Sequence, residues 1–368
     1  MAEMLRILNI VLLLVAVSAS GCKTIPGSGQ SQFSHFIAVT NFSNFTRTEN
    51  GLRETVLTSP EMKSPIAWNE LIVSWNADAG TGTFLKIEAR AISSGHTTRY
   101  YQLGDWSPDN QVFKRTSVRG QKDADGDVKT DTLILAQPAE KVQIRLTLGG
   151  TKGMRPVLKF LGLSLSNTKV ATATRPPNQA AWGKIIPTPE RSQHGYPNAK
   201  GWCSPTSLSM ALARWAEILN RPEMNLTVPE VAAAVYDDDF GGTGNWPFNT
   251  AFAGGFAGMR SFVTRFDDIS EVEDWIAMGI PVILSARWDW LQPGRPLDAD
   301  GHLIVCIGFT KEGDPVINDP ATRLERGESV RHVYKRADVV HSWTKSHNTV
   351  YLVYPENETV PQNLYGHW

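Results

Sequence analysis

The alternation of apolar and polar residues changes once along this chain of 368 residues, and that change limits the folds open to it. From about residue 35 to 167, windows rich in β-formers alternate with period two, as in "NELIVSWNAD" and "GTFLKIEARAI", with turn residues between them. No helical window interrupts this pattern. It predicts an all-β sandwich domain over residues 35–167. Because the chain is too long for one ordinary core, a second domain is expected.

Beyond residue 190 the pattern becomes mixed. Helices are predicted at "PTSLSMALARWAEIL", "TVPEVAAAVYD" and "SEVEDWIAMG", where Ser270 and Glu273 have the spacing of a capping box. Strands are predicted at "IPVILSARW", "HLIVCIGF", "DPVIND" and "TVYLVYP". The sequence therefore predicts an α+β domain over residues 191–368. Residues 168–190, rich in Thr, Ala and Pro, favour a linker, with Trp182 available to dock on one domain.

The N-terminus has the features of a targeting segment. Arg6 precedes an apolar run that is too short to span a bilayer and that ends in small residues before Cys22. Small residues directly before a cysteine resemble the lipobox of bacterial lipoproteins, which implies a signal peptide over residues 1–22 and a lipid anchor on Cys22. An ordinary secretory signal is the alternative. Residues 23–34 read as a flexible tether, and Lys23 weakly favours an outer-membrane or surface location.

The composition argues against several classes of function. The formal net charge is −1, so neither nucleic acid nor a polybasic membrane patch is indicated. The sequence has no metal-ligand spacing and no phosphate-binding glycine loop. The acidic stretch 122–131 lacks the closing glutamate of a calcium loop. We therefore predict neither a cofactor nor a metal.

Tryptophan is frequent, with 12 residues. Trp68, Trp75 and Trp106 fall in the predicted sandwich domain, where they could bind a glycan or a protein at the cell surface. That interpretation rests on architecture alone. Core packing is the alternative, because large aromatic side chains are mostly buried.

The stretch "GWCSPTS" places Cys203 at the predicted start of a helix. Ser204 can cap this helix and Pro205 fits its first turn, which puts the cysteine at the positive end of the helix dipole. That position favours a reactive thiolate. The alternatives are a structural cysteine and a disulfide with Cys306, which itself reads as a buried strand residue.

A thiol nucleophile needs a base and a group that orients the base. His302 begins one predicted strand, Asp319 ends the next, and the short turn "TKEGD" joins the two strands into a hairpin. Folding this hairpin symmetrically would put Asp319 opposite Cys306, so a bulge, a larger turn or strong twist must bring Asp319 to His302. The alternatives are a core role for His302, a turn-forming role for Asp319, and a different base, His341 or His347.

The order of these residues resembles the papain-like fold, and four stretches resemble the bacteriocin-leader-processing (double-glycine) peptidase type within it. These are "SQHGYPNAKGWCSPTSLSMA", "AMGIPVILSARW", "DGHLIVCIGFT" and "VINDP", and the resemblance covers roughly residues 190–356. It implies that Cys203 is the nucleophile, His302 the base and Asp319 the orienting acid. It also implies that Gln193 helps to form the oxyanion hole, although Gln193 lies ten residues before Cys203, several more than usual.

The resulting prediction is an exported, lipid-anchored cysteine peptidase that cleaves peptide bonds in a peptide or protein substrate. Trp202, Trp246 and Asn249 are candidates for the substrate cleft, with packing as the alternative for the two tryptophans. The typical double-glycine enzyme is fused to a transporter, and nothing transporter-like occurs in this sequence, so leader processing does not carry over. The competing hypothesis is a non-catalytic surface-binding protein on a degenerate papain-like scaffold.

Overall fold

The computed structural model describes residues 32–51, 54–291 and 301–368, and residues 32–368 form one compact unit. The predicted signal peptide, Cys22 and most of the predicted tether lie outside the described residues. None of the helices in the described part of the chain is both long and apolar enough to cross a membrane.

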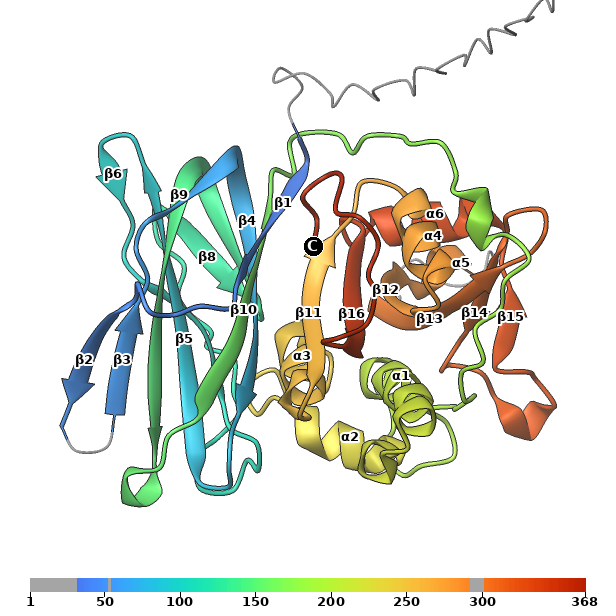
Figure 1. The fold of residues 1–368 in the computed structure, drawn as a ribbon, viewed down its shortest axis with the longest axis horizontal. Helices are drawn as coiled ribbons and strands as arrows, with labels where there is room; N and C mark the ends of the chain where they lie inside the picture. The colour runs from blue at the N-terminus through green and yellow to red at the C-terminus, as the bar shows by residue number, and fades with distance from the viewer. Residues whose placement is uncertain (1–31, 52–53, 292–300) are drawn as a thin grey trace, which may run out of the picture. The chain divides into compact units, whose positions relative to one another are not determined.

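The N-terminal part is rich in strands, as predicted, and all its pairings are antiparallel (Figure 1). Its elements are β1 (Ser34–Val39), β2 (Thr46–Asn50), β3 (Glu54–Thr58), β4 (Met62–Asp78), β5 (Thr83–Ser93), β6 (His96–Thr97), β7 (Tyr101–Trp106), β8 (Gly126–Lys129), β9 (Thr132–Gly150), the 3-10 turn η1 (Thr151–Gly153) and β10 (Val157–Ser166). They hydrogen-bond into one curled ten-stranded sheet in the order β1-β10-β4-β9-β3-β2. Strands β5 and β8 also pair with β9, and β6 and β7 pair with β5. This differs from the two separate sheets of the predicted sandwich, because the long strand β9 pairs with both β4 and β5.

Trp68, Trp75 and Trp106 belong to the core of this sheet and are almost completely buried. The ring centroids of Trp75 and Trp106 lie 6.2 Å apart in an edge-to-face arrangement. Phe248, from a later helix, packs against Trp106 at 5.6 Å. The alternative of core packing therefore holds for these three tryptophans, because almost none of their surface is exposed to a ligand. A ligand of the N-terminal part stays a prediction.

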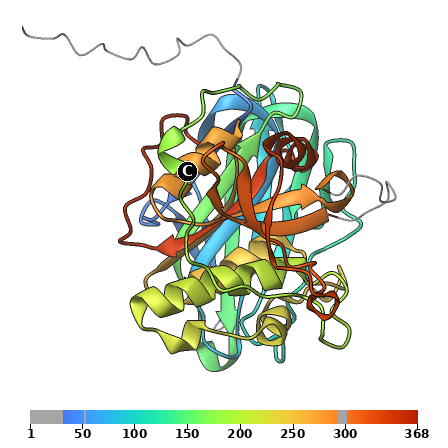
Figure 2. The same cartoon turned by 90° about the vertical axis from the view of Figure 1, so that its right-hand side faces the viewer.

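The C-terminal part combines helices and strands, as predicted, and its strands form one antiparallel sheet. Its elements are η2 (Gln179–Ala181), α1 (Cys203–Leu219), η3 (Pro222–Met224), α2 (Val228–Val235), α3 (Trp246–Gly255), β11 (Met259–Arg265), α4 (Ile269–Ala277), β12 (Val282–Arg287), α5 (Trp288–Leu291), β13 (Gly301–Phe309), β14 (Pro315–Asn318), η4 (Leu324–Arg326), β15 (Arg331–Val333), α6 (Arg336–Thr344) and β16 (Thr349–Pro355). The strand order is β11-β16-β12-β13-β14-β15. The longest described helix, α1, is seen in yellow-green in Figure 2, and it packs on β13 and β16.

The capping box of helix α4 lies two residues earlier than predicted. The box consists of Asp268 and Glu271, whose side chains satisfy the first free backbone N–H groups. Glu273, predicted to close the box, is instead fully buried and accepts a 2.7 Å hydrogen bond from the indole of Trp182. Trp182 therefore docks on the C-terminal part. Gly279 follows the helix with φ +82°, a conformation that glycine adopts without strain.

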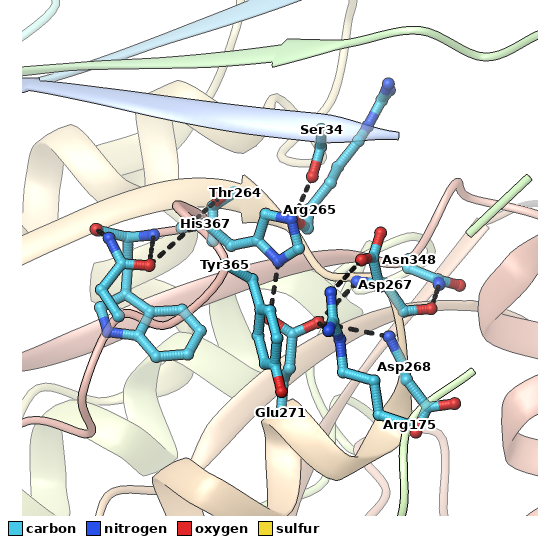
Figure 3. A network of polar contacts seen from close by, with 12 residues as sticks. Ser34, Arg175, Thr264, Arg265, Asp267, Asp268, Glu271, Asn348, Tyr365 and His367 are labelled. Carbon is cyan, nitrogen blue, oxygen red and sulfur yellow. Dashed lines mark hydrogen bonds and ion pairs between the residues drawn. The ribbon is translucent and has the colours of Figure 1, made fainter. Parts of the chain in front are cut away.

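The linker and the C-terminal tail meet at the start of α4 (Figure 3). His367 Nδ1 lies 2.6 Å from Glu271, and Arg175 of the linker forms an ion pair with Asp267 and stacks on Tyr365. Ligand atoms of Asp267, Glu271 and His367 lie within 4.8 Å of one another, a grouping that the sequence did not predict. Because the Arg175 guanidinium already supplies a positive charge to the two carboxylates, we interpret this cluster as structural.

Candidate active site

Cys203 is the first residue of α1 and is only 8% exposed. Trp202, not Ser204, is the N-cap residue, and it has no side-chain cap hydrogen bond. Ser204 is fully buried, with its hydroxyl 2.9 Å from that of Tyr351, so its predicted capping role is wrong. The position of Cys203 at the start of the helix nevertheless agrees with the sequence analysis.

His302 and Asp319 form a buried pair. His302 lies on β13, Asp319 directly follows β14, and His302 Nε2 lies 2.8 Å from Asp319 Oδ1. The side chain of Cys203 lies close enough to the ring to help raise the pKa of His302. Because Nε2 faces Asp319, Nδ1 remains for the thiol. The fold therefore brings Cys203, His302 and Asp319 together in the predicted order.

The hairpin reaches this geometry through a bulge. Val305 pairs with Asn318, and the register shifts between Cys306 and Gly308. This bulge and a turn centred on Glu312 place Asp319 level with Ile304 instead of Cys306. Residues two apart on a strand share a face, so Asp319 becomes the diagonal neighbour of His302.

Asp319 is fully buried and held by further donors. The Tyr334 hydroxyl donates to Oδ2 at 2.7 Å, and the backbone N–H of Ala321 donates to Oδ1 at 2.9 Å. Burial alone would raise the pKa of Asp319, but His302, Tyr334 and Ala321 outweigh burial and lower it. The carboxylate therefore stays ionised beside the imidazole. Sequence reasoning missed Tyr334, because β15 lies beside β14 only in the folded sheet.

The surroundings of His302 favour its protonated form. Burial would lower the pKa of the ring, but the charge and hydrogen bond of Asp319, with a further contribution from Cys203, raise it to about 10. The ring of Trp288 meets the imidazole edge to face at 4.6 Å between centroids. This contact covers one side of the ring and limits its rotation.

Gln193 is largely buried beside the end of the hairpin formed by β13 and β14. Its backbone N–H donates to Pro320 O at 2.8 Å, so it lies next to the residue that follows Asp319. Its side-chain Oε1 is buried without a hydrogen-bond partner. The fold thus accommodates the longer spacing between Gln193 and Cys203, and the role of this side chain in the oxyanion hole stays a prediction.

The three predicted cleft residues differ in exposure. Trp202 and Trp246 are half-buried, and Trp202 packs 6.3 Å from the ring of Tyr196. Asn249 is fully buried, and its amide donates to the carbonyls of Thr243 and Asn245. The structure therefore leaves no face of Asn249 for a substrate, and this side chain instead holds the loop before α3.

The disulfide alternative does not hold. Cys203 and Cys306 are both free thiols. Cys306 is fully buried on β13, and burial raises the pKa of its thiol to about 12, so it is an unreactive core residue as predicted. The alternative bases His341 and His347 are exposed, and His347 lies near Arg265 and Glu70 instead of Cys203.

Comparisons with known proteins agree with the division of the chain into two parts. Residues 16–166 match the family model of the peptidase C39 N-terminal domain, and residues 185–351 match the model of the peptidase C39-like family. No curated protein matches the chain.

Two solved structures show a distant similarity. A protein described as a C39-like peptidase from Bacillus anthracis is 17% identical over 48% of this chain and 99% of its own, with a TM-score of 0.37. A structure of infectious bursal disease virus, Gx strain, is 10% identical over 44% of this chain and 38% of its own, with a TM-score of 0.22. At these scores neither structure informs the site. The two family models, in contrast, match successive stretches of the chain, and residues 185–351 are similar to the peptidase C39-like family.

Proposed function

We propose that this protein is a cysteine peptidase that hydrolyses peptide bonds through Cys203, His302 and Asp319. The observation that carries the proposal is the buried imidazole of His302, which lies 2.8 Å from the Asp319 carboxylate and close enough to the Cys203 thiol for the thiol to help raise its pKa. A nucleophile, a base and a group that orients the base are the parts that covalent amide hydrolysis needs. The C39-like family match supports the same reaction class.

The proposed reaction has two halves. Before the reaction the proton of the Cys203 thiol resides on His302, and the thiolate sulfur attacks the carbonyl carbon to form a tetrahedral intermediate. His302 then gives the proton to the leaving amine as the C–N bond breaks, which leaves a thioester on Cys203. Water attacks the thioester with His302 as its base, and the carboxylic acid leaves as the thiol is restored. Asp319 holds the ring and stabilises its charged form throughout.

The oxyanion would form beside the start of α1. The backbone N–H of Cys203 has no partner within the helix, because it belongs to the first turn. The Gln193 amide group is the proposed second donor, and preorganised donors of this kind stabilise the charge that develops on the carbonyl oxygen. A papain-like arrangement of the domain is part of the same proposal.

A thiol-reactive probe tests the nucleophile directly. We expect an iodoacetamide probe at neutral pH to label the native protein at Cys203 much faster than at the buried Cys306, as mass spectrometry of the peptides would show. Cys203→Ala should lose the fast label, and Cys306→Ala should retain it. Slow labelling of native Cys203, with no cleavage in a panel of peptides, would instead favour the non-catalytic binding protein.

We further propose that the protein is exported and lipid-anchored to a bacterial cell envelope through Cys22. The apolar run and small residues before Cys22 support this proposal. Expressed in a bacterial host, the protein should partition with membranes and incorporate labelled fatty acid. Cys22→Ser should lose both properties, since the anchor needs the thiol; a variant that kept both would contradict the anchor.

A further inference from the structure

The segment between α2 and α3, residues 236–246, is held by the N-terminal part of the chain. Arg115, in the connection between β7 and β8, is almost fully buried. Its guanidinium donates to the carbonyls of Tyr236 at 3.0 Å and Ala233 at 2.9 Å. These carbonyls lie at the C-terminal end of α2, where a positive charge complements the helix dipole.

Asp237 ties the two parts together inside this segment. It is fully buried and accepts hydrogen bonds from both the backbone N–H and the hydroxyl of Ser117, at 2.9 and 3.1 Å. From its own side it accepts from the Asn245 amide at 2.9 Å and the Phe240 N–H at 3.1 Å. One carboxylate thus fixes the loop of residues 236–246 against the N-terminal part.

Asp131 holds the end of the same segment. It lies in the turn between β8 and β9, and its Oδ2 accepts a 2.8 Å hydrogen bond from the N–H of Trp246, the first residue of α3. Burial, followed by smaller effects that include the nearby charge of Asp237, raises the pKa of Asp131 to about 6. The phenol of Tyr351 also lies within electrostatic range of Asp131. A carboxylate at a helix N-terminus favours one orientation of that helix.

Residues 236–246 also contact the tight turn that directly precedes Cys203. The Thr243 hydroxyl donates to the carbonyl of Gly201 at 3.1 Å, and Asn249 holds the carbonyl of Thr243 at 2.9 Å. Gly201 has φ +80° and stands two residues before Cys203. A continuous set of hydrogen bonds therefore runs from the N-terminal part, through residues 236–246, to the start of α1.

Buried charges are costly, and a well-packed apolar interface would hold two parts together without them. Apolar packing is already present, since Phe248 and Ala251 of α3 complete the core of the curled sheet. Directional hydrogen bonds add what apolar packing does not, namely one defined position for the loop.

We propose that the N-terminal strand-rich part is a positioning element of the peptidase site, which fixes residues 236–246 and, through Thr243, the turn that presents Cys203. This inference rests on the proposed function. Thr243, Asp131 and Ser117 are its positioning residues, and none of them needs to touch the substrate. The N-terminal part would thus orient the nucleophile without contributing a residue that touches the substrate.

The test uses the full chain and two substitutions of Thr243. Thr243→Val keeps the shape and removes the hydroxyl, whereas Thr243→Ser keeps the hydroxyl. We expect Thr243→Val to lower kcat about tenfold with little change in KM, the effect of one hydrogen bond to a group that must be aligned for reaction. The rate of iodoacetamide alkylation at Cys203 should fall in parallel. Thr243→Ser should retain both rates.

Asp131→Asn tests the contribution of the N-terminal part, because it removes the charge of this side chain but keeps its shape. It should lower the alkylation rate several-fold, and the double variant with Thr243→Val should lose less than the product of the single losses, because both act along one path. Lys114→Ala, which breaks only the exposed ion pair with Asp238, is the matched control and should match the wild type.

Three results would overturn the inference: wild-type rates in Thr243→Val, an equal loss in Thr243→Ser, or a wild-type alkylation rate in Asp131→Asn. Thermal unfolding of each variant separates a positioning effect from loss of folding, because a destabilised variant regains its rate on cooling. Failure of the proposed function looks different. The wild type itself would then cleave no peptide. The alkylation rates would still show whether the hydrogen bonds through Thr243 affect the reactivity of Cys203.

Discussion

Cys203→Ala and His302→Ala should each lower kcat/KM for peptide hydrolysis by about three orders of magnitude or more. Alanine at position 203 removes the atom that forms the thioester, and alanine at position 302 removes the imidazole that lies beside Cys203 and 2.8 Å from Asp319. The double variant should be no slower than either single variant, because residues that act as one unit lose their joint effect once.

The measurement is steady-state hydrolysis of a peptide found by screening against the wild type. Cys306→Ala is the matched control, since Cys306 is a second buried cysteine on the strand of His302. It should keep kcat/KM within a few-fold, with only a modest loss of stability from the small cavity. Substantial activity in Cys203→Ala, or additive losses in the double variant, would contradict a shared mechanism.

Asp319→Ala should have the second largest effect and should also change the pH dependence of the reaction. Asp319 is the main influence that raises the pKa of His302 to about 10, against the effect of burial. Without it the pKa of His302 should fall, so the alkaline limb of the pH profile should move toward neutral pH. We expect kcat to drop by about two to four orders of magnitude, as when a triad loses its orienting group.

Asp319→Asn separates the two roles of this side chain. An amide can still orient the imidazole, but it carries no charge, so this variant should keep more activity than Asp319→Ala while showing a similar shift of the alkaline limb. Profiles of kcat between neutral and alkaline pH measure both effects. An unshifted limb in both variants would mean that Asp319 does not set the charge of His302.

The same pair makes stability depend on pH. The folded-state pKa of His302 lies above its ordinary value of 6.5, so the protonated ring stabilises the fold fully below about pH 6.5. This contribution is lost as the pH rises through about 10. Asp319, whose pKa is lowered, contributes stability in the opposite direction, lost as the pH falls into the acid range.

Local pattern predicted much of the fold. Period-two alternation identified the main strands of the N-terminal part, and the strand over Thr349–Pro355 has its predicted bounds. The sequence also placed Cys203 at the start of a helix, and α1 does begin at Cys203. The pattern missed helix α3, which has little hydrophobic periodicity and ends in two glycines. It also misplaced the N-cap of α4, which is Asp268 and not Ser270.

The sequence by itself determined which residue types meet at the site, because a helix start and a two-strand hairpin are local structures that neighbouring residues specify. Only the tertiary structure decided the rest. The bulge after Cys306 moves Asp319 to His302, Tyr334 reaches Asp319 from another strand, and Thr243 links the turn before Cys203 to the N-terminal part. Each of these contacts joins residues from separate elements, and their geometry depends on packing and strand register, which no short window of sequence encodes.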